Sequence, residues 1–170
     1  IHYRFFSQSM ESLHEKVFSR FLKGKSILVL EGLAQEFWEK NFPKLIRGSV
    51  AERLLKARKE KATILILSAS PEFLVKPLAK KLQVPLYKGT QYEIDEKNII
   101  RNIRIFVHGE KKAEYVTALQ KELSIESVSA YSDCISDLPL LKIARVPVCV
   151  KPKKKLAALC KKYNWETIDG

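Results

Sequence analysis

Hydrophobic positions recur at helical spacing through the first part of the chain. One set, separated by steps of three and four residues, comprises Met10, Leu13, Val17, Phe18, Phe21 and Leu22. Gly24 supplies a stop, Ser26 can cap a second helix, and Pro43 is expected to interrupt that helix before a third one begins. Because no strand pattern is evident in this stretch, we predict that residues 1–60 form a helical unit.

The pattern changes at Ala62–Leu67, a short and continuous apolar run that is typical of a strand buried on both faces. Ser70 is a good N-cap and Pro71 a good first helical residue, so we expect a helix to about Leu82. Later segments repeat this order of strand, loop and helix: Val128–Ser132 with Leu138–Ile143, then Val146–Val150 with Pro152–Lys162, and a last strand at Glu166–Ile168. The alternation predicts an α/β fold with a Rossmann-like parallel sheet covered on both faces.

Between these units, Tyr92–Val107 alternates between apolar and polar residues and is expected to form a hairpin, followed by an amphipathic helix at Lys111–Leu123. Ligands of parallel sheets bind beyond the carboxyl ends of the strands. The loops Ser68–Ser70 and Ser132–Asp137 each follow a predicted strand directly, and we therefore expect them to carry the function.

Composition limits the classes of protein that remain. The 170 residues, 46% of them hydrophobic, suit one globular domain with at most a small appendage. The three cysteines Cys134, Cys149 and Cys160 form no CxxC pair, so we expect reduced thiols rather than a disulfide framework or a zinc site. Reduced thiols indicate a cytoplasmic protein. No apolar run approaches the ~18 residues of a membrane span, and no secretory signal is visible.

The net charge of +12 attracts polyanions such as phosphorylated substrates, anionic lipid or nucleic acid. A solvated basic surface explains the same charge without any partner. Nucleic-acid binding rests on this charge alone, since neither a basic stripe with interleaved aromatic residues nor a recognisable nucleic-acid-binding fold is visible, and we rank it last.

A few polar residues at the predicted loops could carry chemistry. Asp133 and Asp137 offer two hard oxygen donors that suit Mg²⁺, although a turn-forming and a helix-capping aspartate would look the same. Ser68 ends a strand before a helix, where free backbone N–H groups can bind an anion, with simple capping as the alternative. Lys112 near a helix start opposes the helix dipole, so we expect an acidic or phosphate partner for it unless it is merely solvated.

The order and spacing of these residues resemble motifs two, three and four of the haloacid-dehalogenase (HAD) superfamily. The closest likeness is to the subfamily that contains phosphoserine phosphatase and phosphatidylglycerophosphatase C. Leu65–Val75 is similar to the second motif of that subfamily with its flanks, and Tyr131–Leu141 is similar to the fourth motif. The resemblance covers about Ala62–Asp169 and rests on three separated motifs that agree in order.

The resemblance implies a role for each matching residue. Ser68 and the backbone of Ala69 would hold the transferred phosphoryl group, while Lys112 would bind phosphate and stabilise a nucleophilic aspartate. Lys111 is the neighbouring alternative to Lys112. Asp133 would ligate Mg²⁺, with Asp137 supporting the metal through a direct or a water-mediated contact, and Ser132 stands where glycine is common in the wider superfamily.

The first motif of the family is missing from the chain. Family members begin with a strand ending in an Asp-x-Asp-x-Thr type sequence, whose first aspartate attacks phosphorus and whose second is the general acid and base. The aspartates here are Asp95, Asp133, Asp137 and Asp169. We therefore expect residues 1–60 to be an incomplete helical cap and residues 61–170 to be a HAD-like core that lacks its first strand.

These expectations favour an N-terminally incomplete Mg²⁺-dependent phosphatase acting through an aspartyl-phosphate, inactive without its nucleophile. The alternative is a degenerate, non-catalytic paralogue that binds a phosphorylated ligand. The substrate would be a phosphorylated small molecule or a phospholipid head group. Peripheral contact with an anionic membrane would involve the cap aromatics Phe5, Phe6, Phe18, Phe21, Phe37 and Trp38, which are otherwise cap core.

Overall fold

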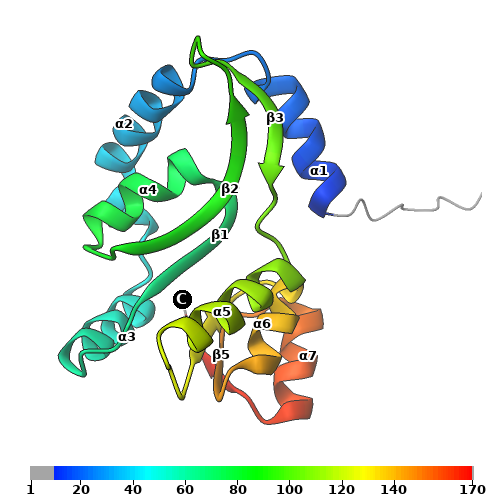
Figure 1. Ribbon diagram of the computed structural model, residues 1–170. Helices are drawn as coiled ribbons and strands as arrows, with labels where there is room; N and C mark the ends of the chain where they lie inside the picture. Colours follow the sequence, from blue (N-terminus) through cyan, green and yellow to red (C-terminus); the bar gives the residue numbers. More distant parts are fainter. Residues whose placement is uncertain (1–9, 170) are drawn as a thin grey trace, which may run out of the picture.

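The computed structural model describes residues 10–169, in which helices before residue 61, called the cap below, are followed by an α/β part, called the core (Figure 1). The cap elements are α1 (Met10–Val17), a π-helical turn η1 (Phe18–Leu22), α2 (Ile27–Leu45) and α3 (Gly48–Lys59). Their apolar spacing therefore forms helices as predicted. Gly24, with a φ of +78°, lies in the turn between η1 and α2 as expected of a helix stop.

Two details of the cap differ from the sequence prediction. Helix α2 is not interrupted at Pro43 but continues to Leu45, so the apolar contacts of this helix outweigh the local cost of an interior proline. Ser26 occupies the N-cap position of α2, yet its side chain makes no capping hydrogen bond. Phe5 and Phe6 lie outside the described residues.

The strands form two separate three-stranded sheets, whereas we predicted a single parallel sheet. The strands of the first sheet are β1 (Leu65–Pro71), β2 (Leu86–Ile94) and β3 (Ile100–Ile105), and those of the second are β4 (Ser129–Ser132), β5 (Val146–Val150) and β6 (Glu166–Ile168). All neighbours are parallel except β2 and β3, which form the predicted hairpin. No strand of residues 10–169 lies between β1 and β4 to join the two sheets.

Helices follow the core strands at the positions that the sequence predicted, with shifted ends. They are α4 (Glu72–Lys81), α5 (Glu110–Glu122), a 3₁₀ turn η2 (Ile135–Asp137), α6 (Leu138–Ile143) and α7 (Lys154–Tyr163). Helix α4 begins one residue later than predicted, because Pro71 takes the N-cap position and Ser70 does not cap it. Within residues 10–169, no helix is both long and apolar enough to cross a bilayer.

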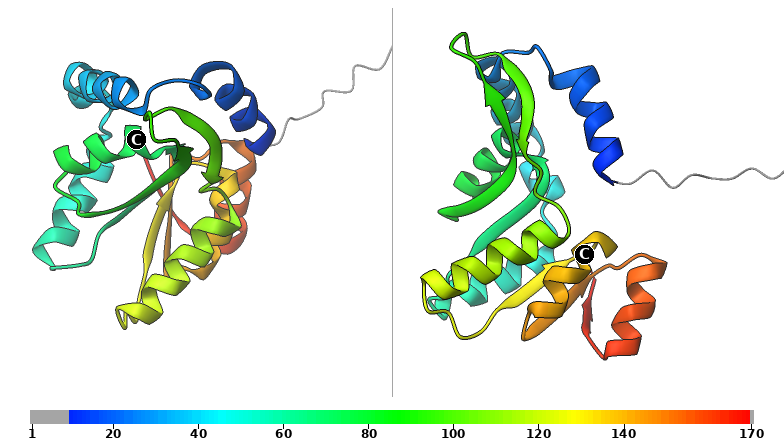
Figure 2. Two further views of the ribbon diagram at one scale, coloured as in Figure 1. Left: turned by 45° about the horizontal axis from the view of Figure 1, so that its top comes forward. Right: turned by 45° about the vertical axis from the view of Figure 1, so that its right-hand side comes forward.

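The hydrophobic core has two clusters. One lies between the second sheet and the helices α5, α6 and α7, around the fully buried Leu141 and Cys149 and the nearly buried Leu156, and Leu65 and Leu67 of β1 pack against it. The other joins Phe18 and Leu22 of the cap to Tyr92 and Ile100 of the hairpin. The β2–β3 hairpin therefore packs with the cap even though it follows residue 61 (Figure 2).

Close packing of backbone holds α4 against β2. At Gly89 an added Cβ would lie 2.6 Å from the Cα of Glu72 and 2.9 Å from the carbonyl oxygen of Ser70. The Glu72 carboxylate accepts hydrogen bonds from the Gly89 amide and from the Gln91 side chain at 3.1 Å and 2.8 Å. Only glycine fits at this crossing, which fixes the start of α4 beside the second strand.

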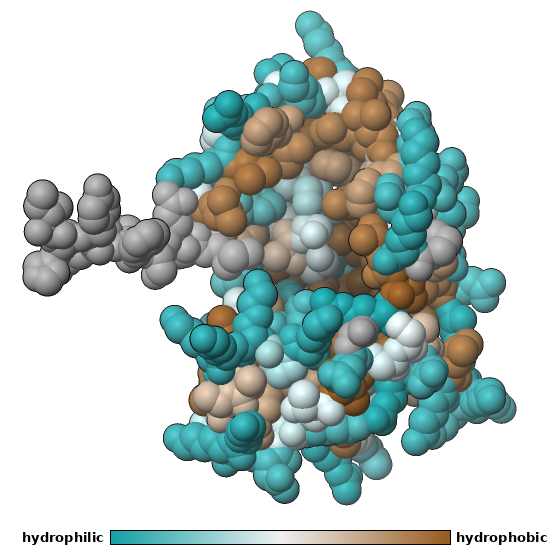
Figure 3. All heavy atoms as spheres, turned by 180° about the vertical axis from the view of Figure 1, so that it is seen from behind, coloured by the Kyte–Doolittle hydropathy of each residue, from teal (hydrophilic) through white to brown (hydrophobic). Residues whose placement is uncertain are grey.

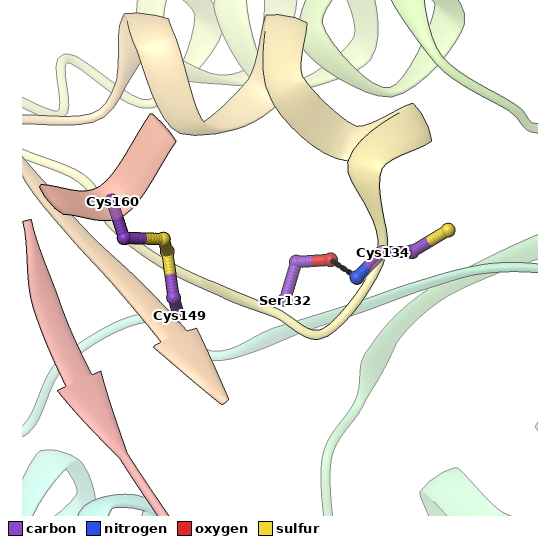
Figure 4. Close-up of a disulfide and its surroundings, with 4 residues drawn as sticks. All are labelled: Ser132, Cys134, Cys149 and Cys160. Carbon is purple, nitrogen blue, oxygen red and sulfur yellow. Dashed lines mark hydrogen bonds between the residues drawn. A yellow bond between two sulfur atoms is a disulfide. The ribbon is translucent and has the colours of Figure 1, made fainter. Parts of the chain in front are cut away.

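The prediction of three reduced thiols is wrong for two of the cysteines. Cys149 of β5 and Cys160 of α7 form a disulfide, and both residues are buried (Figure 4). Helix α7 folds back along the strand that precedes it, and this return brings together residues 11 positions apart. Cys134 is the free cysteine among the described residues and lies in the loop after β4.

Candidate active site

A buried ion pair lies at the carboxyl end of β4. The Lys112 ammonium lies 2.8 Å from Oδ1 and 2.9 Å from Oδ2 of Asp137, and both side chains are about nine-tenths buried. Lys112 belongs to the first turn of α5, where a cation opposes the helix dipole and requires an acidic partner. Asp137 ends the η2 turn, so α5 and the loop after β4 converge on this pair.

Ser132, the last residue of β4, completes the cluster. Its hydroxyl donates to Asp137 Oδ2 at 2.7 Å and accepts from the Cys134 amide at 3.1 Å. The hydroxyl therefore fixes both the carboxylate and the start of the loop that carries Asp133, a role that glycine could not fill (Figure 4). Opposite Ser132 in the ladder lies Cys149, one half of the disulfide.

Asp133 lies in a more open environment than Asp137. Its side chain is 57% exposed, and Oδ2 accepts a hydrogen bond from Arg47 at 3.3 Å. Arg47 is the N-cap residue of α3, so this contact joins the cap to the aspartate loop. An exposed pair of this kind adds only about 0–1 kcal/mol, and Asp133 can exchange its partner at little cost.

The predicted phosphate-binding residues Ser68 and Ala69 lie within β1, so the prediction of a loop at Ser68–Ser70 is wrong: the strand continues to Pro71, with a shift of register after Leu67. The Ser68 hydroxyl accepts from the Ser70 amide at 3.1 Å. The Ala69 carbonyl accepts from the fully buried Thr90 hydroxyl at 2.8 Å. The same hydroxyl accepts from the Val107 amide at 3.3 Å, which ties this part of β1 to the segment leading into α5.

The segment between β3 and α5 makes contacts with both parts of the candidate site. It runs from Val107, bonded to Thr90, to Lys112, bonded to Asp137. At Gly109, where φ is +52°, a Cβ would meet the Ser136 carbonyl oxygen at 3.6 Å. Thr90, which also bonds to Ala69, and the Lys112–Asp137 pair are thus linked through one short segment.

Lys111, the alternative to Lys112, is not part of this cluster. It forms an exposed ion pair with Glu114 at 2.7 Å. The other two aspartates are also placed elsewhere: Asp95 lies between β2 and β3 and pairs with Arg101, and Asp169 follows β6. Hydrogen bonding from the Ile99 amide and from Arg101 holds the pKa of Asp95 below its ordinary value.

An aromatic row lies where the hairpin meets the cap. The ring of His14 in α1 packs at a tilt against Phe106, with 4.6 Å between ring centroids, and Phe106 stacks on His108 at 5.3 Å. His14 Nε2 also lies 3.1 Å from the Tyr92 hydroxyl. Burial lowers the pKa of His14 and raises the pKa of Tyr92 well above its ordinary value, so both groups are neutral at pH 7.

The sequence did not predict a role for Arg47 or Thr90. Nothing in the local sequence marks Arg47, because its partner Asp133 is 86 residues away. Thr90 resembles any strand threonine in the sequence, and only the structure shows that its buried hydroxyl bonds to two backbone groups. Ser132 was noted only as a departure from the family pattern, although its hydroxyl bridges the aspartate loop.

Two carboxylates of the candidate site could bind a hard divalent cation, but they do not form a complete metal site. Asp133 and Asp137 supply carboxylate oxygens, and the exposed Asp133 has a free oxygen. Among residues 10–169, no three His, Cys, Asp or Glu side chains gather closely enough to hold a metal ion. A complete site therefore needs further oxygen ligands from water, phosphate or another segment.

Comparison with known proteins places these features in a family. The model of the family described as haloacid dehalogenase-like hydrolase matches residues 1–142. A Mycobacterium tuberculosis protein named phosphoserine phosphatase SerB1 is 26% identical over 152 residues, which cover 88% of this chain and 49% of that protein. The hydrolase ML2424 from Mycobacterium leprae is 25% identical over the same length. The chain thus spans about half the length of these relatives.

Solved structures share the fold at low sequence identity. A protein of unknown function from Bordetella pertussis superposes with a TM-score of 0.83 at 18% identity, covering 95% of this chain and 75% of that one. A probable phosphoserine phosphatase from Vibrio cholerae superposes with a TM-score of 0.68 at 18% identity, over 89% of this chain and 45% of that one. Both likenesses extend over the cap and the core.

Proposed function

Since the chain belongs to the haloacid dehalogenase-like hydrolase family, we propose that it is the cap and most of the core of a Mg²⁺-dependent phosphomonoester hydrolase. The observation that carries this proposal is the buried cluster of Lys112, Asp137 and Ser132 at the end of β4. A buried cation held by the Asp137 carboxylate, with the Ser132 hydroxyl on the same carboxylate, is suited to a dianionic phosphoryl group.

In this proposal each polar residue of the candidate site has one chemical role. Ser68 and the Ala69 amide hold phosphoryl oxygens, and Lys112 neutralises charge on the phosphate and on the attacking carboxylate. Asp133 and Asp137 would hold Mg²⁺, which would neutralise phosphoryl charge when bound. Arg47 must release Asp133 for that ligation, and its exposure makes this exchange inexpensive.

The nucleophile has to come from outside residues 1–170. Asp133 and Asp137 are assigned to the metal, Asp95 is held by Arg101 and two backbone amides, and Asp169 follows the last strand. We infer that a preceding segment supplies an aspartate whose carboxylate attacks phosphorus and displaces the alcohol of the substrate, which takes up a proton. Water then hydrolyses the aspartyl-phosphate, which releases inorganic phosphate and regenerates the aspartate. The chain is in this sense N-terminally incomplete.

Phosphoserine is the first substrate to test, because relatives of this chain carry that name. The aromatic row of His14, Phe106 and His108 would face the organic part of the substrate. A phospholipid head group at an anionic membrane is a second candidate, since Phe21 and Phe37 of the cap are 57% and 41% exposed and the chain carries a net charge of +12.

A degenerate paralogue that binds phosphate without turnover is the competing function, favoured by the lack of a nucleophile in residues 1–170. Titration of inorganic phosphate, followed by calorimetry with and without Mg²⁺, tests the anion site common to both functions. Lys112→Met and Ser68→Ala should weaken binding about tenfold or more, while Lys111→Met should not. Equal affinity of all three variants would contradict the proposed site.

Turnover separates the two functions. The chain alone should not hydrolyse phosphoserine or an aryl phosphate, with or without Mg²⁺. Metal-dependent hydrolysis that disappears in Asp133→Asn would show that the chain has its own nucleophile and would refute the incomplete-enzyme proposal. A longer form that carries an aspartate on a preceding strand yet still fails to hydrolyse any phosphomonoester would favour the paralogue.

A further inference from the structure

A pocket of about 230 Å³ lies where the end of α2, the helix α3 and the end of α4 meet. Among the residues that the structure describes, Arg47 is the single charged member of its lining. The other members are apolar: Leu45, Ile46, Val50, Ala51, Leu54 and Leu82. Helix α3 buries none of its residues completely, and Leu45 is 51% exposed. The pocket therefore presents apolar surface that the described chain does not cover.

The size of the pocket limits what it can hold. Apolar cavities of about 150 Å³ bind benzene, so a pocket of this volume has room for one ring or for an alkyl chain of about six to eight carbons. Larger ligands would extend into solvent. The apolar part of an occupant is thus a small group rather than a long lipid chain.

Arg47 adds an anion-binding group to this apolar lining. Its Nη2 donates to Oδ2 of Asp133 at 3.3 Å, and the two side chains are 40% and 57% exposed. Within residues 10–169 the guanidinium makes no other hydrogen bond, so the remaining donors of its planar fork are available to a second carboxylate. Arg47 already holds one carboxylate, and it holds that one at long distance in an exposed position.

The surroundings of the pocket favour an anion over a cation. Lys44 precedes Leu45 at the end of α2, and Lys81 precedes Leu82 at the end of α4; both lysines are exposed. Lys81 Nζ lies 5.7 Å from the centroid of the Phe42 ring, which brings the ends of these two helices together. Glu52 on α3 is the one acidic residue directly beside the lining in the sequence. The balance of charge around the pocket is positive.

We propose that this pocket binds a small amphipathic carboxylate, whose alkyl chain or ring of about six to eight carbons fills the apolar part while the carboxylate bonds to Arg47. The ligand competes with Asp133 for the guanidinium, so occupancy of the pocket weakens this contact between the cap and the aspartate loop. Coupling between two binding events is reciprocal, and weakening the Arg47–Asp133 contact therefore strengthens binding of the ligand. The binding site does not depend on the proposed function; under that function, the released Asp133 would be available to Mg²⁺.

Isothermal titration of the full 170-residue chain with straight-chain carboxylates tests the site. Butanoate, hexanoate, octanoate and decanoate are the probes. Each buried methylene should tighten binding about fourfold, and the gain should end at about eight carbons, when the pocket is full. Octanol, which has the same chain but no charge, should bind about tenfold more weakly than octanoate, because it lacks the charge-assisted bond to Arg47.

Four variants locate the binding. Arg47→Met should weaken octanoate about tenfold and leave octanol unchanged. Arg53→Met is the matched control, because Arg53 lies on the same helix but pairs with Glu166 and does not line the pocket; octanoate affinity should not change. Asp133→Asn removes the competing charge and should tighten octanoate about two- to fivefold, the range of an exposed ion pair. Ala51→Phe fills the pocket and should abolish binding of octanoate and octanol.

Apolar surface elsewhere on the molecule provides the competing explanation. Figure 3 shows apolar side chains gathered around a hollow between the cap and the core. Octanoate held there by its chain alone would bind equally to the wild type, Arg47→Met and Ala51→Phe, and that result would overturn the inference, as would equal affinities for octanoate and octanol or no binding of either. An unchanged affinity in Asp133→Asn would refute the competition for Arg47. Should Ala51→Phe fail to fold by circular dichroism, the opposite effects of Arg47→Met and Asp133→Asn still decide the question.

Discussion

Lys112→Met should lower the free energy of unfolding by about 3–5 kcal/mol, the range for removing one partner of a buried ion pair. The substitution keeps the length of the side chain but deletes the ammonium. It leaves the Asp137 carboxylate, whose side chain is 10% exposed, with the Ser132 hydroxyl as its remaining hydrogen-bond donor. The penalty therefore comes from an uncompensated buried charge.

The size of this effect follows from two opposing contributions. At 2.8 Å and an effective dielectric constant of about 20, the attraction between Lys112 and Asp137 is about 6 kcal/mol. Desolvation costs several kcal/mol for each ion, so the intact pair adds little net stability. Removing both charges should therefore be far less harmful than removing one, and Lys112→Met/Asp137→Leu should recover most of the loss.

Urea denaturation followed by circular dichroism measures the free energy of unfolding of these variants. In a thermal scan of this 170-residue chain, the single substitution should lower Tm by about 6–20 °C. Lys111→Met is the matched control, because its ion pair with Glu114 is exposed and contributes at most about 0.5 kcal/mol. The reasoning fails if Lys112→Met costs no more than Lys111→Met, or if the double variant is less stable than the single one.

Further substitutions and conditions test other parts of the structure. Gly89→Ala should lower the free energy of unfolding by about 1–3 kcal/mol, because the added methyl group would lie 2.6 Å from the backbone of α4. Gly32→Ala should raise it by about 0.5–1 kcal/mol, because the space around Gly32 in α2 is open. Urea denaturation measures both variants. Thr90→Val should cost about 1–3 kcal/mol in the same assay, since it leaves two backbone groups without their bonds, and Thr90→Ser should not. Burial lowers the pKa of His14 below its ordinary 6.5, so the unfolded chain binds more protons near that pH; Tm should fall as the pH decreases through 6.5, and less steeply in His14→Phe. Reduction with dithiothreitol should cost about 2–3 kcal/mol for a loop closed over 11 residues, while Cys160→Ser should not respond to it; equal responses would contradict the disulfide.

Local patterns predicted most elements of this fold. The last strand, Glu166–Ile168, has the predicted bounds, and the hairpin and α5 lie where alternation and helical spacing indicated. The pairing of the strands was harder to predict from the sequence than the strands themselves, because pairing depends on segments far apart in the chain. Whether β1 meets β4 is decided by what lies between them, and no pattern within either strand carries that information.

The candidate site was predictable where a residue type opposes its surroundings. Lys112 at a helix start required an acidic partner, and the structure supplies Asp137. Arg47 and Thr90 have ordinary local contexts, and their importance arises from contacts across the fold. The disulfide escaped prediction for the same reason, since its two cysteines become neighbours only when α7 folds back on β5.

The two ion pairs of the candidate site belong to one arrangement of charge. In the described chain, Lys112 neutralises Asp137 and Arg47 neutralises Asp133, so two cations of the protein hold the two carboxylates proposed for Mg²⁺. In the proposed function, the attacking aspartate would compete for Lys112, and an oxygen of Asp137 would then be left without its cation. A divalent ion compensates such a concentration of negative charge, because it binds several carboxylates at once. The proposed nucleophile would therefore create the demand for the metal.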